Sequence, residues 1–146
     1  MSDVLLISLV FPSDSVSTAQ IMGDLSVDLK QYGKNITVIS TIPHYNVKNS
    51  QEGSSHLKSK WGKILYQSDF YGIKVYHVFM PQKGGNKFWR IFWWIFFHIM
   101  TVIVGMTIIP RPSIIFAPSP PLTIGLTTWF LGFFYKVPSI YNVQEI

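Results

Sequence analysis

With 146 residues, the chain has the length of one ordinary domain and can bury a core. Apolar residues make up 48% of it and charged residues only 13%, which is about half the usual charged share, so some apolar surface needs cover from another domain, a partner or lipid. The net charge of +5 comes without a basic stripe of interleaved aromatics, so no nucleic-acid partner is expected. The absence of cysteine excludes disulfides, thiol nucleophiles and thiolate metal sites.

The first elements predict a strand, a helix and a second strand. Val4 to Val10 is a short apolar run, typical of a parallel strand covered on both faces. Ser17 and Gln20 form a capping box that predicts a helix to about Tyr32. Asn35 to Ile42 is the expected second strand, which completes one right-handed βαβ unit. The helix face expected to be buried consists of Ile21, Met22, Leu25, Leu29 and Tyr32.

The middle of the chain predicts a hairpin between two loops. The polar stretch from Pro43 to Lys60 is expected to be a loop, because it is rich in Ser, Asn and Gly. Lys63 to Gln67 and Ile73 to Phe79 predict two strands joined by a turn at 69–72. Residues 81–86 predict the second loop.

The last part continues the alternation of helices and strands. Ile114 to Ala117 predicts another buried strand. The turn at 118–121 can start a helix, with Ser119 as N-cap and Pro120 at the first helical position, and Leu122 to Tyr135 predicts that helix. Pro138 to Val143 predicts the last strand. This alternation predicts an α/β domain with a mostly parallel sheet.

One segment, Phe88 to Ile109, is apolar all round and long enough to span a bilayer. A span would place strands of one sheet on opposite sides of the membrane, where their edges could not pair. We therefore expect a helix that lies in the membrane interface, with tryptophans at headgroup level and basic residues toward phosphate. A buried core helix and a true span remain as alternatives, and His98 inside the segment is an ordinary helix residue or a site. The residues expected to contact the membrane are Lys87, Trp89, Arg90, Trp93 and Trp94.

Candidate ligand-binding residues follow the strands. The loop at 13–17 precedes a helix N-terminus that favours an anion, although it lacks the glycine pattern of dinucleotide and P-loop sites and also fits a plain N-capped helix. Four further candidates for the cleft would lie at the same sheet edge, each with an ordinary loop or capping role as the alternative. They are His44, Tyr45, Ser119 and Glu145. The sequence contains no evident catalytic triad, carboxylate pair or metal-ligand spacing.

Several of these motifs, in this order and spacing, resemble the amino-terminal domain of family 4 glycosyltransferases. The group they are most similar to is the bacterial polysaccharide transferases of the colanic-acid and fucosamine type. The matching stretches cover essentially the whole chain: Leu9–Asp14, Ser17–Gln20, Gln31–Ile39, Thr41–Tyr45, Gly72–Val75, Ala117–Pro121 and Asn142–Glu145.

The resemblance implies a Rossmann-like domain that forms one half of a GT-B fold. Residues 1–146 would be the acceptor-side domain, with the donor-binding domain absent and little activity alone. The implied chemistry is retaining transfer of a sugar from a nucleotide-sugar donor to a lipid-linked or polysaccharide acceptor, without metal or other cofactor. The implied donor-phosphate loop is Ser15, Val16, Ser17 and Thr18, in which Val16 departs from the glycine common in the family.

No signal peptide opens the chain, since Asp3 and an apolar strand stand where a basic region would. We therefore expect the cytoplasmic face of the inner (plasma) membrane, with peripheral or monotopic attachment. Three other interpretations remain open. They are a subunit of a split transferase whose partner chain carries the donor domain, a non-catalytic membrane-associated interaction module, and a small integral membrane protein.

Overall fold

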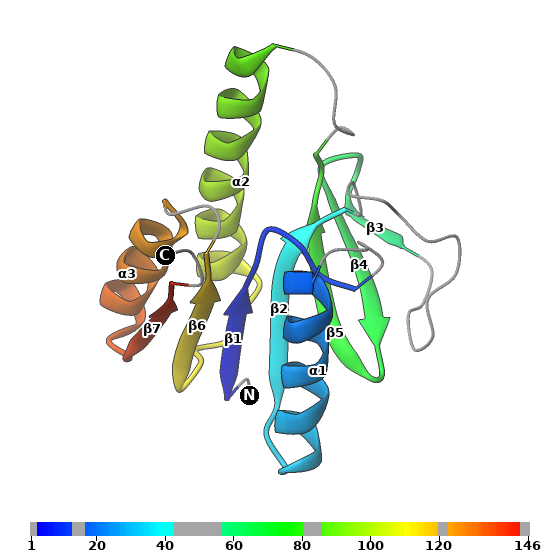
Figure 1. Cartoon of the computed structure of the whole chain (residues 1–146), viewed down its shortest axis with the longest axis vertical. Coiled ribbons are helices and arrows are strands. Elements are labelled where there is room, and N and C mark those ends of the chain that lie inside the picture. The colour runs from blue at the N-terminus through cyan, green and yellow to red at the C-terminus, as the bar shows by residue number, and fades with distance from the viewer. Residues whose placement is uncertain (1–2, 13–16, 43–56, 81–85, 120–122, 144–146) are drawn as a thin grey trace.

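The computed structural model describes residues 3–12, 17–42, 57–80, 86–119 and 123–143. Within them, a seven-stranded sheet is sandwiched between helices, with α1 on one face and α2 and α3 on the other (Figure 1). The helices are α1 (Ser17–Gln31), α2 (Lys87–Thr107) and α3 (Ile124–Tyr135). The strands are β1 (Val4–Ile7), β2 (Ile36–Thr41), β3 (Lys58–Trp61), β4 (Leu65–Phe70), β5 (Ile73–Val78), β6 (Ile114–Pro118) and β7 (Ser139–Asn142).

The sheet has the strand order β3-β4-β5-β2-β1-β6-β7. Strands β5, β2, β1, β6 and β7 run parallel, while β4 pairs antiparallel with both β5 and β3. Leu6 of the central strand β1 lies opposite Val38 on one side and Phe116 on the other. The mostly parallel, Rossmann-like α/β fold predicted from the sequence is confirmed.

The core has two parts because the parallel strands are buried on both faces. Leu5 and Ile7 point toward α2 and α3, where they join Phe97 in one apolar cluster. Leu6 points the other way and packs with Met22 of α1 in a second cluster. Alternate side chains thus serve opposite layers, which explains why β1 reads as a continuous apolar run.

Helix α1 is turned about its axis relative to the prediction. Ile21 and Tyr32 are 52% and 83% exposed, whereas the small residues Ala19, Gly23 and Ser26 are buried with Met22. A Cβ atom on Gly23 would clash with the Pro12 ring, so the helix approaches the chain after β1 along its small side chains. The predicted burial of Ile21 and Tyr32 was wrong. Close packing of α1 through its small residues stabilises the fold more than burial of these two side chains would.

Several predicted boundaries also differ. The first strand of the hairpin, predicted from Lys63 to Gln67, is β4 from Leu65 to Phe70. Lys58–Trp61 forms strand β3 inside the stretch expected to be a loop; its side chains are all exposed, so it is held by backbone pairing with β4 rather than by an apolar pattern. Helix α3 begins at Ile124 with Thr123 as its N-cap, so the predicted start at Ser119 was wrong. Ser119 instead lies buried at the end of β6, where its N–H donates to the Asn142 carbonyl at 2.9 Å.

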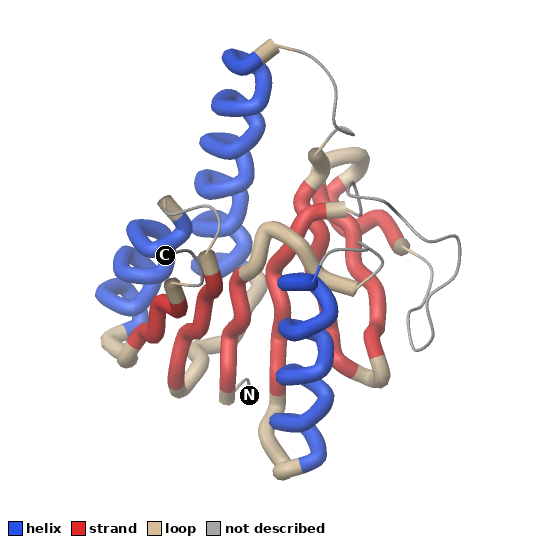
Figure 2. The backbone as a smooth tube through the Cα atoms, in the orientation of Figure 1, coloured by secondary structure: helices blue, strands red, loops and turns tan. Residues whose placement is uncertain are grey.

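Helix α2 covers the sheet with its second half only. Its first turns, Lys87–Phe92, are exposed throughout and rise beyond the carboxyl ends of the parallel strands (Figure 2). Phe97, Met100 and Val104 in the second half are buried. Among the described residues, α2 is the one helix long and apolar enough to cross a membrane, judged by length and composition.

Candidate functional site at the carboxyl edge of the sheet

The structure places some of the predicted site residues and leaves others undescribed. Ser17 is exposed at the first position of α1, with Thr18 next to it and partly covered. Ser119 is fully buried at the end of β6. These elements meet at the carboxyl edge of the sheet, where ligands of open α/β folds bind. Ser15, Val16, His44, Tyr45 and Glu145 lie outside the described residues.

Two buried hydroxyls shape the chain where it leaves β1. The Ser8 Oγ donates to the Val10 carbonyl at 2.7 Å, and the Thr41 Oγ1 at the end of β2 donates to the Leu9 carbonyl at 2.8 Å. In both bonds a side-chain hydroxyl donates to a main-chain carbonyl and so holds the main chain in place. They hold residues 9 and 10, which follow β1, against the sheet.

A buried histidine on β5 joins three strands near the same edge. His77 Nδ1 lies 2.9 Å from the Thr41 carbonyl oxygen, which can only accept, so Nδ1 carries the proton. His77 Nε2 then accepts from the Ser68 hydroxyl at 2.6 Å. Burial lowers the pKa of His77 to about 4, so the ring is neutral near pH 7.

The pairing of a serine hydroxyl with an imidazole also occurs in nucleophilic catalysis. Here His77 is 4% and Ser68 8% exposed, and each points into the layer beneath α1 rather than to solvent. We therefore assign the pair a structural role, as a hydrogen-bonded link from β4 through β5 to β2.

Ser40 is the neighbour of His77 across the strand pair β2–β5. Its side chain is fully buried, and its Oγ has no hydrogen-bond partner among the described residues. A buried hydroxyl without a partner is costly. It marks this part of the carboxyl edge as a place where a further polar group would be accommodated.

The described part of this edge offers neutral hydrogen-bonding groups and the positive end of a 15-residue helix. Within the described residues no group of acidic, histidine or cysteine side chains could hold a metal ion. The arrangement therefore suits binding of a hydroxylated or anionic ligand. Sequence reasoning missed Ser40 and His77. Other polar residues, such as Thr37 and Lys74, stand in the same strands, so these two positions do not stand out in the sequence.

The predicted membrane-contact residues differ in their surroundings. Lys87 and Arg90 are exposed at the start of α2, with Trp89 59% exposed between them. The Arg90 guanidinium lies over the partly buried Trp94 ring, 5.6 Å from its centre. Trp93 is also partly buried, edge-to-face against Phe79 at 5.5 Å, so it anchors α2 to the end of β5.

His98 has two partners on α3 rather than a free face. Its Nε2 lies 2.8 Å from Thr123 Oγ1 and its Nδ1 2.9 Å from Thr127 Oγ1. Burial lowers its pKa as well. His98 therefore links α2 to the N-cap and first turn of α3.

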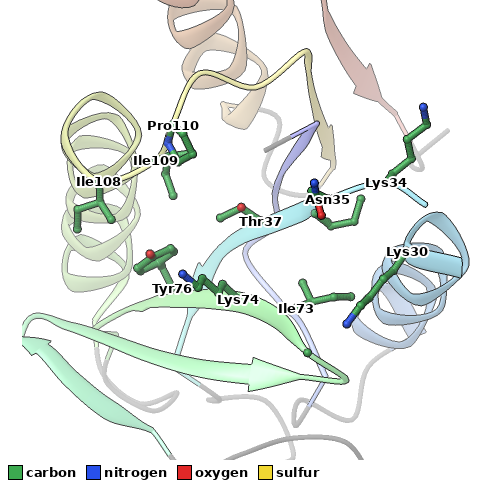
Figure 3. Close-up of a pocket in the computed structure, with 12 residues that line it drawn as sticks. Lys30, Lys34, Asn35, Thr37, Ile73, Lys74, Tyr76, Ile108, Ile109 and Pro110 are labelled. Carbon is green, nitrogen blue, oxygen red and sulfur yellow. The ribbon is translucent and has the colours of Figure 1, made fainter. Parts of the chain in front are cut away.

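A separate hollow of about 380 Å³ lies at the opposite, amino edge of the sheet (Figure 3). Lys30, Lys34 and Lys74 line it together with Thr37 and Tyr76. The Lys30 Nζ is already engaged, donating to the Tyr71 carbonyl at 2.6 Å. This basic hollow is distant from the carboxyl edge, so it is not part of the site that the topology of the sheet defines.

The fold defines the class, which is a Rossmann-like α/β domain with a mostly parallel seven-stranded sheet. Among solved structures, the chain superposes on the catalytic domain of starch synthase IV from Arabidopsis thaliana, bound to ADP and acarbose, with a TM-score of 0.71 and 11% identity. The match covers 99% of this chain and 34% of that one, so the chain corresponds to about one third of the starch synthase and resembles one half of its GT-B fold.

A second similar structure is the C-terminal domain of a hydrogenase from Pyrococcus furiosus. Its TM-score is 0.58 at 9% identity, with 97% of this chain and 90% of that chain covered. No family model matches the sequence, and no curated protein matches it either. At these identities the structural similarities show the fold alone.

Proposed function

We propose that this chain is the acceptor-side domain of a membrane-associated glycosyltransferase, which transfers a sugar from a nucleotide-sugar donor to a lipid-linked or polysaccharide acceptor. The observation that carries the proposal is the match of nearly the whole chain to one half of a GT-B glycosyltransferase. The order of the family 4 motifs along the sequence supports the same assignment. The second, donor-binding half would come from a further domain, in the same polypeptide or in a partner chain.

In this proposal the N-terminus of α1 faces the donor phosphates. Backbone N–H groups at a helix start and the hydroxyls of Ser17 and Thr18 are donors suited to a diphosphate leaving group. The Ser8 and Thr41 hydrogen bonds would hold residues 9 and 10, which precede this helix, in place before substrate arrives. Ser119 and the other predicted cleft residues, His44, Tyr45 and Glu145, would surround the acceptor.

The proposed attachment is to the cytoplasmic face of the inner (plasma) membrane, through the exposed start of α2. Strands β5 and β6, which precede and follow α2, belong to one continuous sheet. A bilayer cannot separate them, so the helix would enter the interface and return rather than span it. Lys87, Trp89 and Arg90 are exposed where such a contact would form.

The test is transfer of label from a panel of radiolabelled nucleotide sugars to a polyprenyl-diphosphate-linked acceptor in anionic vesicles. The full chain is assayed alone and together with the product of the neighbouring reading frame, as a source of the donor domain. We expect transfer only in the combination. Replacing Ser17→Ala and Thr18→Ala together should lower transfer by about tenfold, because two donors to charged oxygens are lost.

The matched control is Gln31→Ala, an exposed position at the other end of the same helix, which should leave the rate unchanged. Absence of transfer, together with absence of association between the chain and the donor domain, would reject the glycosyltransferase assignment. Vesicle binding without any transfer would favour the non-catalytic membrane module instead.

A further inference from the structure

The outer surface of α2 and α3 is apolar over both helices, not over α2 alone. On α3, Leu126 is 71%, Trp129 64% and Phe133 75% exposed. Ile95 and Ile99 on α2 are 53% and 54% exposed. Contiguous apolar surface of this extent marks an interaction site.

Between the two helices this surface is hollowed into a groove of about 450 Å³, within the range of ligand pockets. Its walls are Ile99, Val102 and Ile103 from α2 and Leu126, Trp129 and Phe130 from α3. At one end lie His98 and Thr127, which are hydrogen-bonded to each other. No charged side chain is among the described lining residues.

The two helices that form the groove carry no acidic residue, and the charged residues on them are Lys87 and Arg90 of α2 and Lys136 at the C-cap of α3. Between Asp69 and Glu145 the sequence contains no acidic residue. A groove without charge, in a segment with basic residues only, complements a hydrocarbon chain that carries an anionic head group. The basic residues of this segment are Lys74, Lys83, Lys87, Arg90, Arg111 and Lys136.

The direction of the groove ties it to the ligand edge. Thr123 and Thr127, which hold His98, belong to the start of α3, and this start follows Ser119 at the carboxyl end of β6. Gly105, further along α2, packs against Leu131, further along α3, so the two helices run side by side away from that edge. A chain lying in the groove with its head at the His98 end would place that head over the carboxyl edge.

We propose that the groove between α2 and α3 binds the hydrocarbon tail of a lipid-linked acceptor and thereby positions its phosphate-bearing head over the carboxyl edge of the sheet. This inference rests on the proposed function for the identity of the lipid. The binding of the tail does not require sugar transfer, so it is tested by labelling and not by turnover.

The experiment uses the full chain on anionic vesicles that contain a polyprenyl diphosphate with a photoactivatable group in its tail. After irradiation, labelled peptides are mapped by mass spectrometry. We expect label within 99–103 and 126–130, competed by unlabelled polyprenyl diphosphate and not by an equal amount of phosphatidylglycerol. Ile103→Trp, which fills the groove, should reduce labelling about tenfold, a loss of about 1.4 kcal/mol in binding.

The matched control is Phe133→Trp, an exposed change on α3 outside the groove, which should label as the unchanged chain does. Circular dichroism and vesicle flotation of both variants report whether fold and membrane contact persist. Equal competition by phosphatidylglycerol, or undiminished labelling of Ile103→Trp, would overturn the groove assignment and leave general insertion of the apolar surface. If the label still enters the groove but the chain and the donor domain together transfer no sugar, the result counts against the proposed function alone.

Discussion

At the scale of single residues, the best-defined interaction is the buried link from Ser68 through His77 to the Thr41 carbonyl. It satisfies every polar atom of a ring that β5 carries into the interior. A neutral imidazole is required, because a buried cation without a counter-charge is strongly disfavoured. This requirement gives the fold a defined pH dependence.

His77 has a folded pKa of about 4 against an ordinary value of 6.5. As the pH falls, the His77 ring takes up a proton in the unfolded chain before it does so in the folded one. The contribution of His77 to the free energy of unfolding should therefore be complete above about pH 6.5 and be lost as the pH falls toward 4. The expected loss over that window is about 3 kcal/mol. It is measured as the free energy of unfolding by urea titration at several pH values.

His77→Gln should be less stable near pH 7 and should show a flatter pH profile over the same window. Ser68→Ala serves as the control, because it removes one hydrogen bond and keeps the titrating ring, so its profile should retain the slope. If the free energy of unfolding of His77→Gln kept the full dependence on pH, the buried neutral ring would not be the source of that dependence.

At the scale of elements, helix packing depends on small residues as much as on large ones. Gly105 of α2 lies against Leu131 of α3, so that a Cβ placed there would be 3.0 Å from the nearest Leu131 methyl. Gly23 of α1 plays the same part against Pro12. These contacts set the distances between layers.

Gly105→Leu should destabilise the domain by about 1–3 kcal/mol, because the added side chain has no space between the helices. Met106→Leu, on the exposed side of the same turn, should change stability by less than about 0.5 kcal/mol. Thermal unfolding of the two variants checks the difference. An unchanged midpoint for Gly105→Leu would contradict the packing described here.

The elements themselves could largely be predicted from the sequence, since buried parallel strands and the apolar α2 leave strong patterns. The orientation of α1 could not, because Ala19, Gly23 and Ser26 are weakly apolar and gain their burial from close approach. Strand β3 could not be predicted either, because its side chains are all exposed and show no alternation of apolar and polar residues. At the candidate site, the roles of Ser17, Thr18 and Ser119 stay predictions, made from topology and from the family resemblance. His77 and Ser68 were missed, because they depend on a cross-strand pairing that spacing does not reveal.

At the scale of the whole molecule, basic and large apolar side chains lie together at the exposed start of α2. Lys87 and Arg90 stand at the exposed end of α2 beside Phe88 and Trp89. The proposed membrane contact therefore combines insertion of rings with attraction to anionic head groups.

The double variant Lys87→Gln and Arg90→Gln should bind anionic vesicles about thirtyfold more weakly, because each basic residue near such a surface contributes about 1 kcal/mol. Lys58→Gln with Lys60→Gln, exposed on β3, is the control and should bind as the unchanged chain does. Flotation at low and high salt measures the vesicle binding of both double variants. The difference in binding between them should shrink at high salt, because salt screens the attraction to the head groups. Equal binding of the two double variants would remove the basic residues of α2 from the contact.

The central strand has a consequence for synthesis. β1 pairs with β2 soon after both are made, yet its other edge stays open until β6, more than a hundred residues later in the chain, is available. Helix α2 emerges before β6 and α3, which complete its packing, so for that interval its apolar length has only part of its final cover. A nascent chain in this state exposes both an unpaired strand edge and a bare helix, the two features that recruit chaperones or a membrane surface. From the order of the elements along the chain we therefore expect the nascent domain to be prone to aggregation until β6 and α3 have been made.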